Sequence, residues 1–334
     1  MHSAWRWISA LALAGLLLPA EAAGPAASDA DAQPADARAW LARIHAAANE
    51  RNYQGTMVFS AGGMLSSSRV AHFCVGHRSF ERLEALDGRQ QRIYRLDDTV
   101  HTLWPQAKVA ILEKRTPASK LPSATQAVEP RALDQYELHG EGSERIAGRE
   151  AQVFLLQPRD ELRYAQRLWA DKATGLMLRA DVIGPQRTVL ESTAFSEVEI
   201  GIKAAPESVT QPVKQLDGYR VVHLVQQRTR LADEGWVIEH GVPGFSLTGC
   251  VKRPLESATG EAQVLQAVFS DGLTHVSLFI EPFDARRAYA NASGRIGATA
   301  TLRQRHGDYW ITVVGDVPAP TLKVFADALE RRRP

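Results

Sequence analysis

Residues 136–201, YELHGEGSERIAGREAQVFLLQPRDELRYAQRLWADKATGLMLRADVIGPQRTVLESTAFSEVEIG, contain the pattern that decides the fold. Short apolar runs alternate with tight turns, and no helical period interrupts them. The apolar strand at residues 153–156 ends at Pro158, because proline has no N–H to donate to a neighbouring strand. Residues 171–175, DKATG, predict a hairpin loop with Gly175 at a position that needs a positive φ.

Leu168-Trp169-Ala170 and Leu176-Met177-Leu178 flank this loop, and apolar side chains alternate with Arg and Asp along both arms of the hairpin. The alternation predicts a sheet with one buried face and one solvated face. Such a sheet is typical of a binding surface rather than of an active site.

The sequence before this segment predicts a helix and then an antiparallel meander. The helix begins at residues 34–36 and carries apolar side chains on one face, among them Trp40, Leu41 and Ile44. Tight turns such as Asp87-Gly88 separate the strands that follow. The predicted strands are 56–60, 69–73, 80–86, 91–96 and 99–104. Residues 116–130 contain three prolines and predict a long mobile loop, after which the meander continues to residue 200.

The last third of the chain predicts a second, smaller domain. Proline and polar residues at 204–217 predict a linker, and a new strand series begins at residues 219–225. The further strands are 244–247, 264–269, 273–280, 298–304 and 309–314. After Pro318, the apolar residues Leu322, Phe325 and Leu329 predict a closing amphipathic helix. The pattern predicts an α+β chain with an N-terminal domain at 36–203 and a C-terminal antiparallel sheet-and-helix domain at 218–334. A length of 334 residues is sufficient for two hydrophobic cores.

The N-terminus has the pattern of a secretory signal peptide. Arg6 precedes an apolar run at residues 7–18, Pro19 ends the run, and Ala20-Glu21-Ala22 offers small residues for cleavage. The run is too short to cross a bilayer, which takes about 20 residues. We therefore expect residues 1–22 to be removed, residues 23–35 to be a disordered lead-in, and the mature protein to be soluble and outside the cytoplasm.

Charge and cysteine content limit the function further. Lys and Arg number 39 against 38 Asp and Glu, so no broad basic surface is expected to attract nucleic acid. Cys74 and Cys250 are the only thiols, and they fall in different predicted domains. We expect two free thiols; an interdomain disulfide would need Cα atoms within about 7 Å.

One cluster has residue types that bind metals. His72 and Cys74 would share a strand face, and Gly76 could turn His77 back toward them. Zinc usually takes four protein ligands, or three and a water, and no second Cys/His pair lies nearby. These are therefore expected to be ordinary strand residues, with a metal-dependent hydrolase as the alternative. Residues 140–144, GEGSE, miss the G-x-S-x-G pattern of a serine hydrolase, and neither an enzyme nor a cofactor is predicted.

Aromatic side chains offer a candidate ligand site. Phe59, Trp104 and Trp169 fall on predicted strands of the first domain. They either pack in its core or line an open apolar groove beneath a helix.

Several short motifs together resemble the RseB/MucB family, the periplasmic regulators of the sigma-E envelope stress response in Gram-negative bacteria. Four belong to the first domain: YQGT at 53–56, ERLEALDG at 81–88, ERIAGR at 144–149 and Thr174-Gly175-Leu176. Arg163-Tyr164 and Leu168-Trp169 add to them. FSDGL at 269–273 and VVGDVP at 313–318 fit the family's second domain.

The resemblance implies an N-terminal domain similar to LolA and LolB, an incomplete antiparallel β-barrel with covering helices around an apolar cavity. It implies a partner, the periplasmic domain of a membrane-spanning anti-sigma-E factor, which the protein would shield from proteolysis. It also implies release by lipopolysaccharide or another amphiphile, and association as a homodimer. On this basis Trp104 and Trp169 are expected to border an acyl-binding groove. A periplasmic lipid or lipoprotein carrier of the LolA type is the alternative that rests on the first domain alone.

Overall fold

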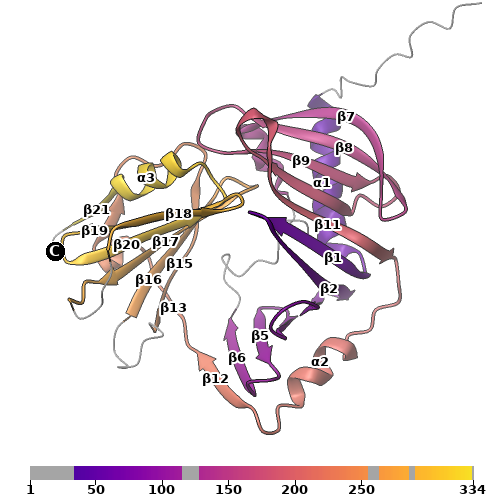
Figure 1. Cartoon of the computed structure of the whole chain (residues 1–334), viewed down its shortest axis with the longest axis horizontal. Helices are drawn as coiled ribbons and strands as arrows, with labels where there is room; N and C mark the ends of the chain where they lie inside the picture. The colour runs from indigo at the N-terminus through magenta and orange to yellow at the C-terminus, as the bar shows by residue number, and fades with distance from the viewer. Residues whose placement is uncertain (1–33, 115–127, 255–262, 286–289, 333–334) are drawn as a thin grey trace, which may run out of the picture.

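A computed structural model of the chain describes residues 34–114, 128–254, 263–285 and 290–332. The predicted signal peptide, the lead-in up to residue 33, and residues 115–127 of the predicted loop lie outside the described residues. The remainder folds around one large sheet, one smaller sheet and a two-stranded sheet, with three α-helices and three short 3₁₀ helices (Figure 1). The 3₁₀ helices are η2 (Pro130–Asp134), η3 (Pro185–Arg187) and η4 (Ala232–Glu234).

The first part of the chain is built on a 12-stranded, strongly curved sheet (Figure 1). Its neighbouring strands are antiparallel except for one parallel pair, β12 and β6. The two outermost strands, β12 and β7, do not pair with each other, so the sheet is open. The spatial order is β12 (Arg220–Leu224), β6 (Val109–Lys114), β5 (Thr99–Trp104), β4 (Arg92–Leu96), β3 (Arg78–Ala85), β2 (Met64–Val75), β1 (Tyr53–Ala61), β11 (Val189–Ile200), β10 (Met177–Ile183), β9 (Ala165–Asp171), β8 (Arg149–Pro158) and β7 (Tyr136–Ile146).

Local turn chemistry sets the hairpins of the opening segment. Gly175 has φ of +81° and ends the β9–β10 loop. Asp171 fixes that loop, because its Oδ1 accepts hydrogen bonds from the backbone N–H and the hydroxyl of Thr174, both at 2.7 Å. Arg43 then docks the loop on the first helix by donating to the carbonyl oxygens of Lys172 and Ala173.

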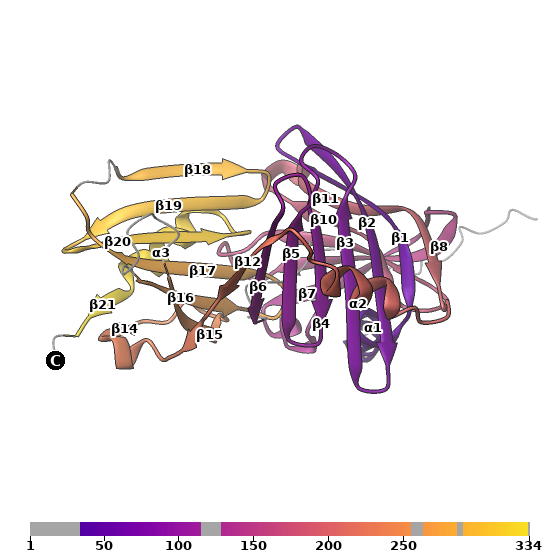
Figure 2. The ribbon, with the colours of Figure 1, turned by 90° about the horizontal axis from the view of Figure 1, so that it is seen from below.

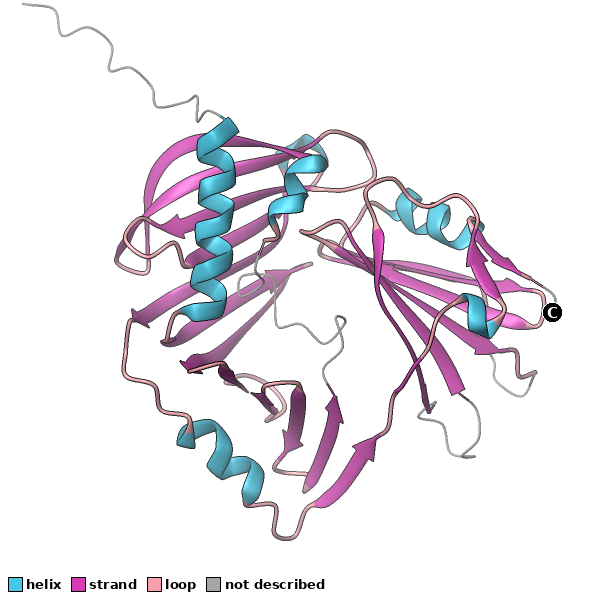
Figure 3. Cartoon of the chain, turned by 180° about the vertical axis from the view of Figure 1, so that it is seen from behind, coloured by secondary structure: helices cyan, strands magenta, loops and turns pink. Residues whose placement is uncertain are grey.

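Two helices cover opposite faces of the large sheet. Helix α1 (Pro34–Glu50) buries Leu41 and Ile44 against the strand residues Phe154 and Leu168, and Figure 3 shows it lying across the strands. Helix α2 (Glu207–Lys214) buries Val209 among residues of β2 to β6, and Figure 2 shows it in front of those strands. We call these the α1 face and the α2 face.

The second part holds a seven-stranded antiparallel sheet and a closing helix. Helix α3 (Ala319–Asp327) packs Leu322 and Phe325 into its core. A two-stranded sheet pairs β14 (Trp236–Ile238) with β21 (Leu329–Arg331). The larger sheet has the order β13 (Gln227–Arg228), β15 (Ser246–Pro254), β16 (Gln263–Ser270), β17 (His275–Pro282), β20 (Tyr309–Gly315), β19 (Thr299–His306) and β18 (Ala292–Ile296).

The predicted fold class is confirmed: an open antiparallel sheet with covering helices is followed by a smaller antiparallel sheet with a helix. Several details of the prediction are wrong, and strands β14 and β18 are absent from it. Strand β6 was not predicted, and helix α2 lies within residues that were predicted to be a linker. Strand β12, which was expected to start the second strand series, instead extends the first sheet beside β6. Pairing between distant segments is tertiary information that a local pattern does not carry.

No helix within the described ranges combines the length and the apolar character needed to cross a membrane.

Candidate functional site at the junction of the two sheets

Two loops join the two parts by reciprocal packing. Residues 159–164, between β8 and β9, place Leu162 against the core of the second part. Residues 271–274, between β16 and β17, place Leu273 in the core beneath α1 in the first part. Because each part supplies an apolar side chain to the core of the other, the junction is a packed interface rather than a flexible tether.

A buried ion pair lies at the centre of this junction. Arg163 Nη1 is 3.3 Å from the carboxylate of Asp271, and both side chains have an exposed fraction of 0%. Arg163 also contacts Asp160 at 3.1 Å and donates to the carbonyl oxygen of Pro243 at 2.6 Å. The hydroxyl of Tyr136 donates to Asp271 at 3.1 Å. Buried charges are stable only when they are paired and hydrogen-bonded, and here the pairing is better than the hydrogen bonding: Arg163 lies within ion-pair distance of two carboxylates, but within the described residues its Nε and Nη1 have no hydrogen-bond partner.

Burial nevertheless shifts the titration of the acidic groups in this network. Burial raises the pKa of the Asp271 carboxyl, although two backbone N–H groups, Arg163 and Tyr136 favour its charged form. Burial and the nearby Asp271 charge also raise the pKa of the Tyr136 hydroxyl well above its usual value. The cost of desolvating Asp271 therefore exceeds the stabilisation that its partners give to the carboxylate.

Backbone contacts lock the same interface. The N–H of Glu129 donates to the carbonyl oxygen of Gly272 at 2.9 Å, and the hydroxyl of Thr321 on α3 donates to that of Leu162 at 2.9 Å. Gly272 has φ of +98°, and a Cβ there would lie 2.9 Å from Arg131 Cγ and 3.0 Å from the backbone nitrogen of Ala132. Glycine is thus required both by its conformation and by the close approach of the first part.

A pocket of about 360 Å³ opens beside the junction. Tyr164, from the loop that holds Arg163, lines one side, and Leu322 on α3 lines another. The remaining wall includes Gly294 of β18, which is the edge strand of the smaller sheet, and all five β18 residues are exposed. An exposed edge strand beside a pocket can accept an extended polypeptide, and among the described residues no strand pairs with the outer edge of β18.

The sheet register separates the predicted aromatic residues. Phe59 pairs with Thr193, Thr193 with Ala180, and Ala180 with Leu168 of the α1 cluster, so Phe59 lies on the α1 face. Trp104 follows Leu103, which packs with α2, and therefore also lies on the α1 face by alternation.

Trp169 follows Leu168 along β9 and so lies on the α2 face. There its indole N–H donates to Glu144 at 2.9 Å, and the Arg179 guanidinium lies 4.4 Å from its ring centroid. Phe59 and Trp104 are half-buried, whereas Trp169 is only 3% exposed. By strand alternation the side chains of Trp104 and Trp169 point to opposite faces of the sheet, which argues against one groove bordered by both; ligand binding by Phe59, Trp104 and Trp169 stays a prediction.

The alternative reading of His72, Cys74 and His77 as a metal site is not supported by their geometry. His72 and Cys74 do share a face, with Nε2 and Sγ 3.9 Å apart, but His72 Nδ1 is engaged by the Arg51 carbonyl oxygen at 2.9 Å. His77 lies in the exposed turn after β2. Among the described residues no three His, Cys, Asp or Glu side chains are grouped closely enough to hold a metal ion.

The two cysteines are not bridged. Burial raises the pKa of the Cys250 thiol to about 11, and burial together with nearby Glu50 and Glu81 raises the pKa of the Cys74 thiol. Neither thiol is activated as a nucleophile, which requires a lowered pKa.

Sequence reasoning did not find the junction residues as a site. Arg163 and the stretch containing Asp271 were noted only as parts of motifs. The sequence did show a charged residue next to apolar ones in each motif, Arg163 in one and Asp271 in the other. Because 107 residues separate them, the sequence alone does not indicate that they form a pair.

Comparisons with known proteins agree with this architecture. The family model described as "MucB/RseB N-terminal domain" matches residues 36–213, and the one described as "MucB/RseB C-terminal domain" matches residues 230–330. The sigma factor AlgU regulatory protein MucB of Pseudomonas aeruginosa is 30% identical over 308 residues, which cover 88% of this chain and 90% of MucB. The sigma-E factor regulatory protein RseB of Haemophilus influenzae is 25% identical, over 91% of this chain and 94% of RseB.

Comparison with solved structures also shows similarity to MucB. A structure of the Pseudomonas aeruginosa MucA/MucB complex contains a chain with a TM-score of 0.69 and 27% identity, covering 90% of this chain and 100% of that chain. A crystal structure of MucB in complex with MucA(peri) has a TM-score of 0.67 at 27% identity, with the same coverage. The chain is thus similar to MucB over both of its parts.

Proposed function

The chain belongs to the MucB/RseB family, and we propose that it is a periplasmic regulator that binds the periplasmic domain of a membrane-spanning anti-sigma factor. The observation that carries the proposal is the similarity, over 90% of the chain, to MucB in its complex with MucA. The predicted signal peptide at residues 1–22 would deliver the protein to that compartment.

The junction supports the proposal by offering a surface for a polypeptide. The pocket beside Tyr164 and the exposed edge strand β18 lie next to each other, and a packed interface holds them in place. In this scheme an extended anti-sigma segment lies along the edge strand and places side chains in the pocket. Occupancy would shield the segment from proteases by mass action alone, without any catalytic step.

An amphiphile would release the partner by favouring a state that does not bind it. A hundredfold shift requires a difference in binding free energy of about 2.7 kcal/mol. Burial of a few methylene groups, at about 0.8 kcal/mol each, is sufficient. We place the acyl chain on the α1 face, where Phe59 and Trp104 are half-buried, and we leave Trp169 out because it lies on the other face.

A blocked pocket tests the proposed docking surface. Gly294 has no positive φ, and a Cβ there would meet nothing within 4 Å, so the chain can accommodate Gly294→Trp while the indole obstructs the pocket. Gly241 lies outside the pocket, has no positive φ, and a Cβ there would also meet nothing within 4 Å. Gly241→Trp is therefore the matched control. Calorimetric titration of the anti-sigma periplasmic domain should show binding to the unsubstituted chain and to the control, with affinity for Gly294→Trp at least about tenfold weaker.

Absence of binding to the unsubstituted chain would contradict the proposed function. Equal affinity of Gly294→Trp and Gly241→Trp for the anti-sigma domain would show that the pocket is not part of the docking surface. The proposal includes association as a homodimer, which sedimentation equilibrium of the mature chain tests.

A further inference from the structure

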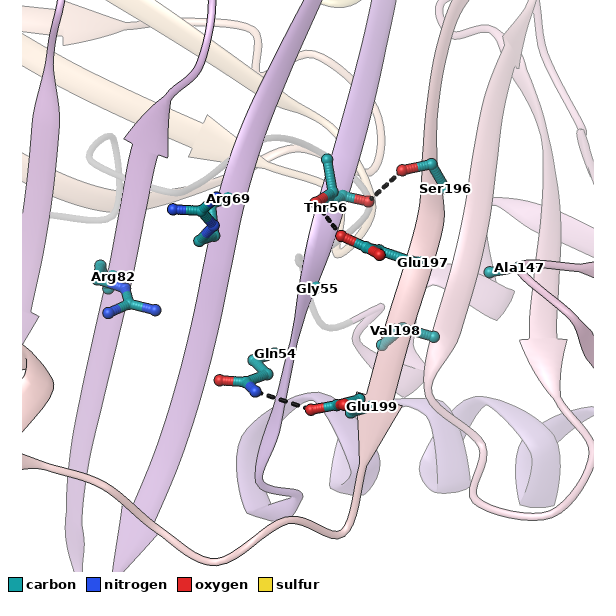
Figure 4. Close-up of a pocket in the computed structure, with 10 residues that line it drawn as sticks. All are labelled: Gln54, Gly55, Thr56, Arg69, Arg82, Ala147, Ser196, Glu197, Val198 and Glu199. Carbon is teal, nitrogen blue, oxygen red and sulfur yellow. Dashed lines mark hydrogen bonds between the residues drawn. The ribbon is translucent and has the colours of Figure 1, made fainter.

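A polar groove of about 390 Å³ lies on the α2 face of the large sheet and shares no lining residue with the junction pocket. Figure 4 shows Arg69 of β2 and Arg82 of β3 on one side of it, and Glu197 and Glu199 of β11 on the other. Ala147, at the tip of the β7–β8 hairpin, borders the glutamate side. A volume of this size is typical of a small-molecule site.

The sheet register fixes the order of the charged groups. Paired residues on neighbouring strands form two adjacent rows across the groove, each running from a guanidinium to a carboxylate, and the first row continues beyond Arg69 to Glu84 of β3. Neighbouring strands lie about 4.8 Å apart, so the positive and negative ends of a row are separated by two or three such spacings. The rows are Arg69–Thr56–Glu197 and Arg82–Ala71–Gln54–Glu199.

The arginine wall lacks a strong counter-charge. Among the described residues, Arg82 has no carboxylate within ion-pair distance, and its Nε is buried without a hydrogen-bond acceptor. Arg69 is 3.9 Å from Glu84, with 57% of its side chain exposed, which makes a weak pair. A guanidinium without a paired carboxylate is unfavourable, and an anionic ligand group in the groove would balance its charge.

The glutamate wall is oriented but keeps acceptors available. Glu197 Oε1 accepts a hydrogen bond from the Thr56 hydroxyl at 2.7 Å, and Glu199 Oε2 accepts one from Gln54 Nε2 at 2.7 Å. Each carboxylate is therefore fixed through one oxygen. Within the described part of the chain, neither glutamate forms an ion pair. The carboxylates of Glu197 and Glu199 therefore need a positively charged ligand group to balance their charge.

From these two walls we infer that the groove binds a small zwitterion, with its carboxylate or phosphate between Arg69 and Arg82 and its ammonium group between Glu197 and Glu199. A ligand with only negative charge would be repelled by the glutamates, and one with only positive charge by the arginines. This inference goes beyond the proposed function and does not depend on it. Amino acids, short peptides and ethanolamine phosphate headgroups share the required chemistry.

The test uses amide chemical shifts of the full mature chain during titration with charge-matched probes. The zwitterion 6-aminohexanoate carries both groups, whereas hexanoate and hexylamine each carry one. Glycerophosphoethanolamine represents the headgroup source and 6-aminohexanoate the carboxylate source. We expect at least one zwitterion to shift the resonances of Gly55 and Ala71 saturably, with affinity at least about tenfold above that of hexanoate or hexylamine.

Two variants tie binding to the groove. Arg82→Gln and Glu199→Gln each remove one charge, from opposite walls, and each should weaken binding by about fivefold or more. Arg89→Gln is the control, because Arg89 is exposed and lies outside the groove. Absence of saturable shifts with either zwitterion would overturn the inference, as would equal binding of the singly charged probes or undiminished binding by both groove variants.

Discussion

The guanidinium of Arg163 and the carboxylate of Asp271 lie 3.3 Å apart, fully buried, and they come from the two different parts of the chain. The same carboxylate accepts hydrogen bonds from the backbone N–H groups of Leu273 and Thr274 at 2.9 and 2.8 Å. One aspartate thus orders its own loop and also joins that loop to the first part. Asp271 is therefore one of the contacts that hold the two sheets together, beside the packing of Leu162 and Leu273.

Asp271→Ala should lower the free energy of unfolding by about 3 kcal/mol or more, because it leaves Arg163 with a single carboxylate, Asp160, and removes the acceptor of two buried N–H groups. Urea denaturation followed by tryptophan fluorescence measures the change. Asp233→Asn removes a partner from the exposed Arg230–Asp233 pair and should leave the urea midpoint unchanged. Equal midpoints for Asp271→Ala and the unsubstituted chain would show that the junction pair does not hold the parts together.

Gly272→Ala should destabilise the chain more than Gly63→Ala does, by about 1–2 kcal/mol. Both glycines have positive φ, +98° and +81°, so the conformational strain is shared. Only at Gly272 would the added Cβ collide with the first part, whereas at Gly63 nothing lies within 4 Å. The two urea midpoints decide the matter, and a loss of stability at Gly63 as large as that at Gly272 would argue against close packing at the junction.

Asp316 gives a pH dependence with a defined sign. Burial raises the pKa of its carboxyl, which is opposed by the hydrogen bond that the Thr299 hydroxyl donates at 2.5 Å. The folded state therefore binds the proton more tightly than the unfolded state. The resulting contribution to stability is complete below the unfolded pKa, about 3.9, and is lost as the pH rises through the higher folded pKa.

Relative to Asp316→Asn, the unsubstituted chain should consequently lose stability as the pH rises from about 4 toward 7. Unfolding free energies of both proteins, measured in urea at several pH values, provide the comparison. A difference that stays constant with pH, or that changes in the opposite direction, would exclude a raised pKa for Asp316.

Trp104 should report the binding of an amphiphile. It is half-buried on the α1 face, so an acyl chain beside it would move its emission to shorter wavelength. We expect lipopolysaccharide to shift the emission of the unsubstituted chain and of Trp169→Phe, but to have little effect on Trp104→Phe. An undiminished response in Trp104→Phe would place the acyl chain elsewhere.

The sequence predicts those features that local chemistry determines. The loop at Asp171–Gly175 follows from a glycine with positive φ and an aspartate that accepts hydrogen bonds from its own loop. The helix at α3 follows from Pro318 and an apolar face. Strand β6 also left a signal, the apolar run at residues 109–112, although it was not recognised next to the turn that ends at Lys108 with φ of +51°.

Features that depend on distant partners were not predictable in the same way. Strand alternation places neighbouring residues of β9 on opposite faces, but it does not say which face packs against α1. The face to which Trp169 points can be assigned only from the sheet register and the core contacts. Helix α2 contains Pro212 and has only eight residues, and its stability comes from burying Val209 rather than from helix propensity. The pairing of Arg163 with Asp271 likewise depends on how two domains meet.

Protease protection tests the central claim most directly. The periplasmic domain of the anti-sigma factor is exposed to a protease alone, with the mature chain in excess, and with the chain and lipopolysaccharide together. The account predicts slow cleavage in the presence of the chain and a return toward the unprotected rate when lipopolysaccharide is added. Equal cleavage rates with and without the chain, at concentrations that saturate binding, would contradict it.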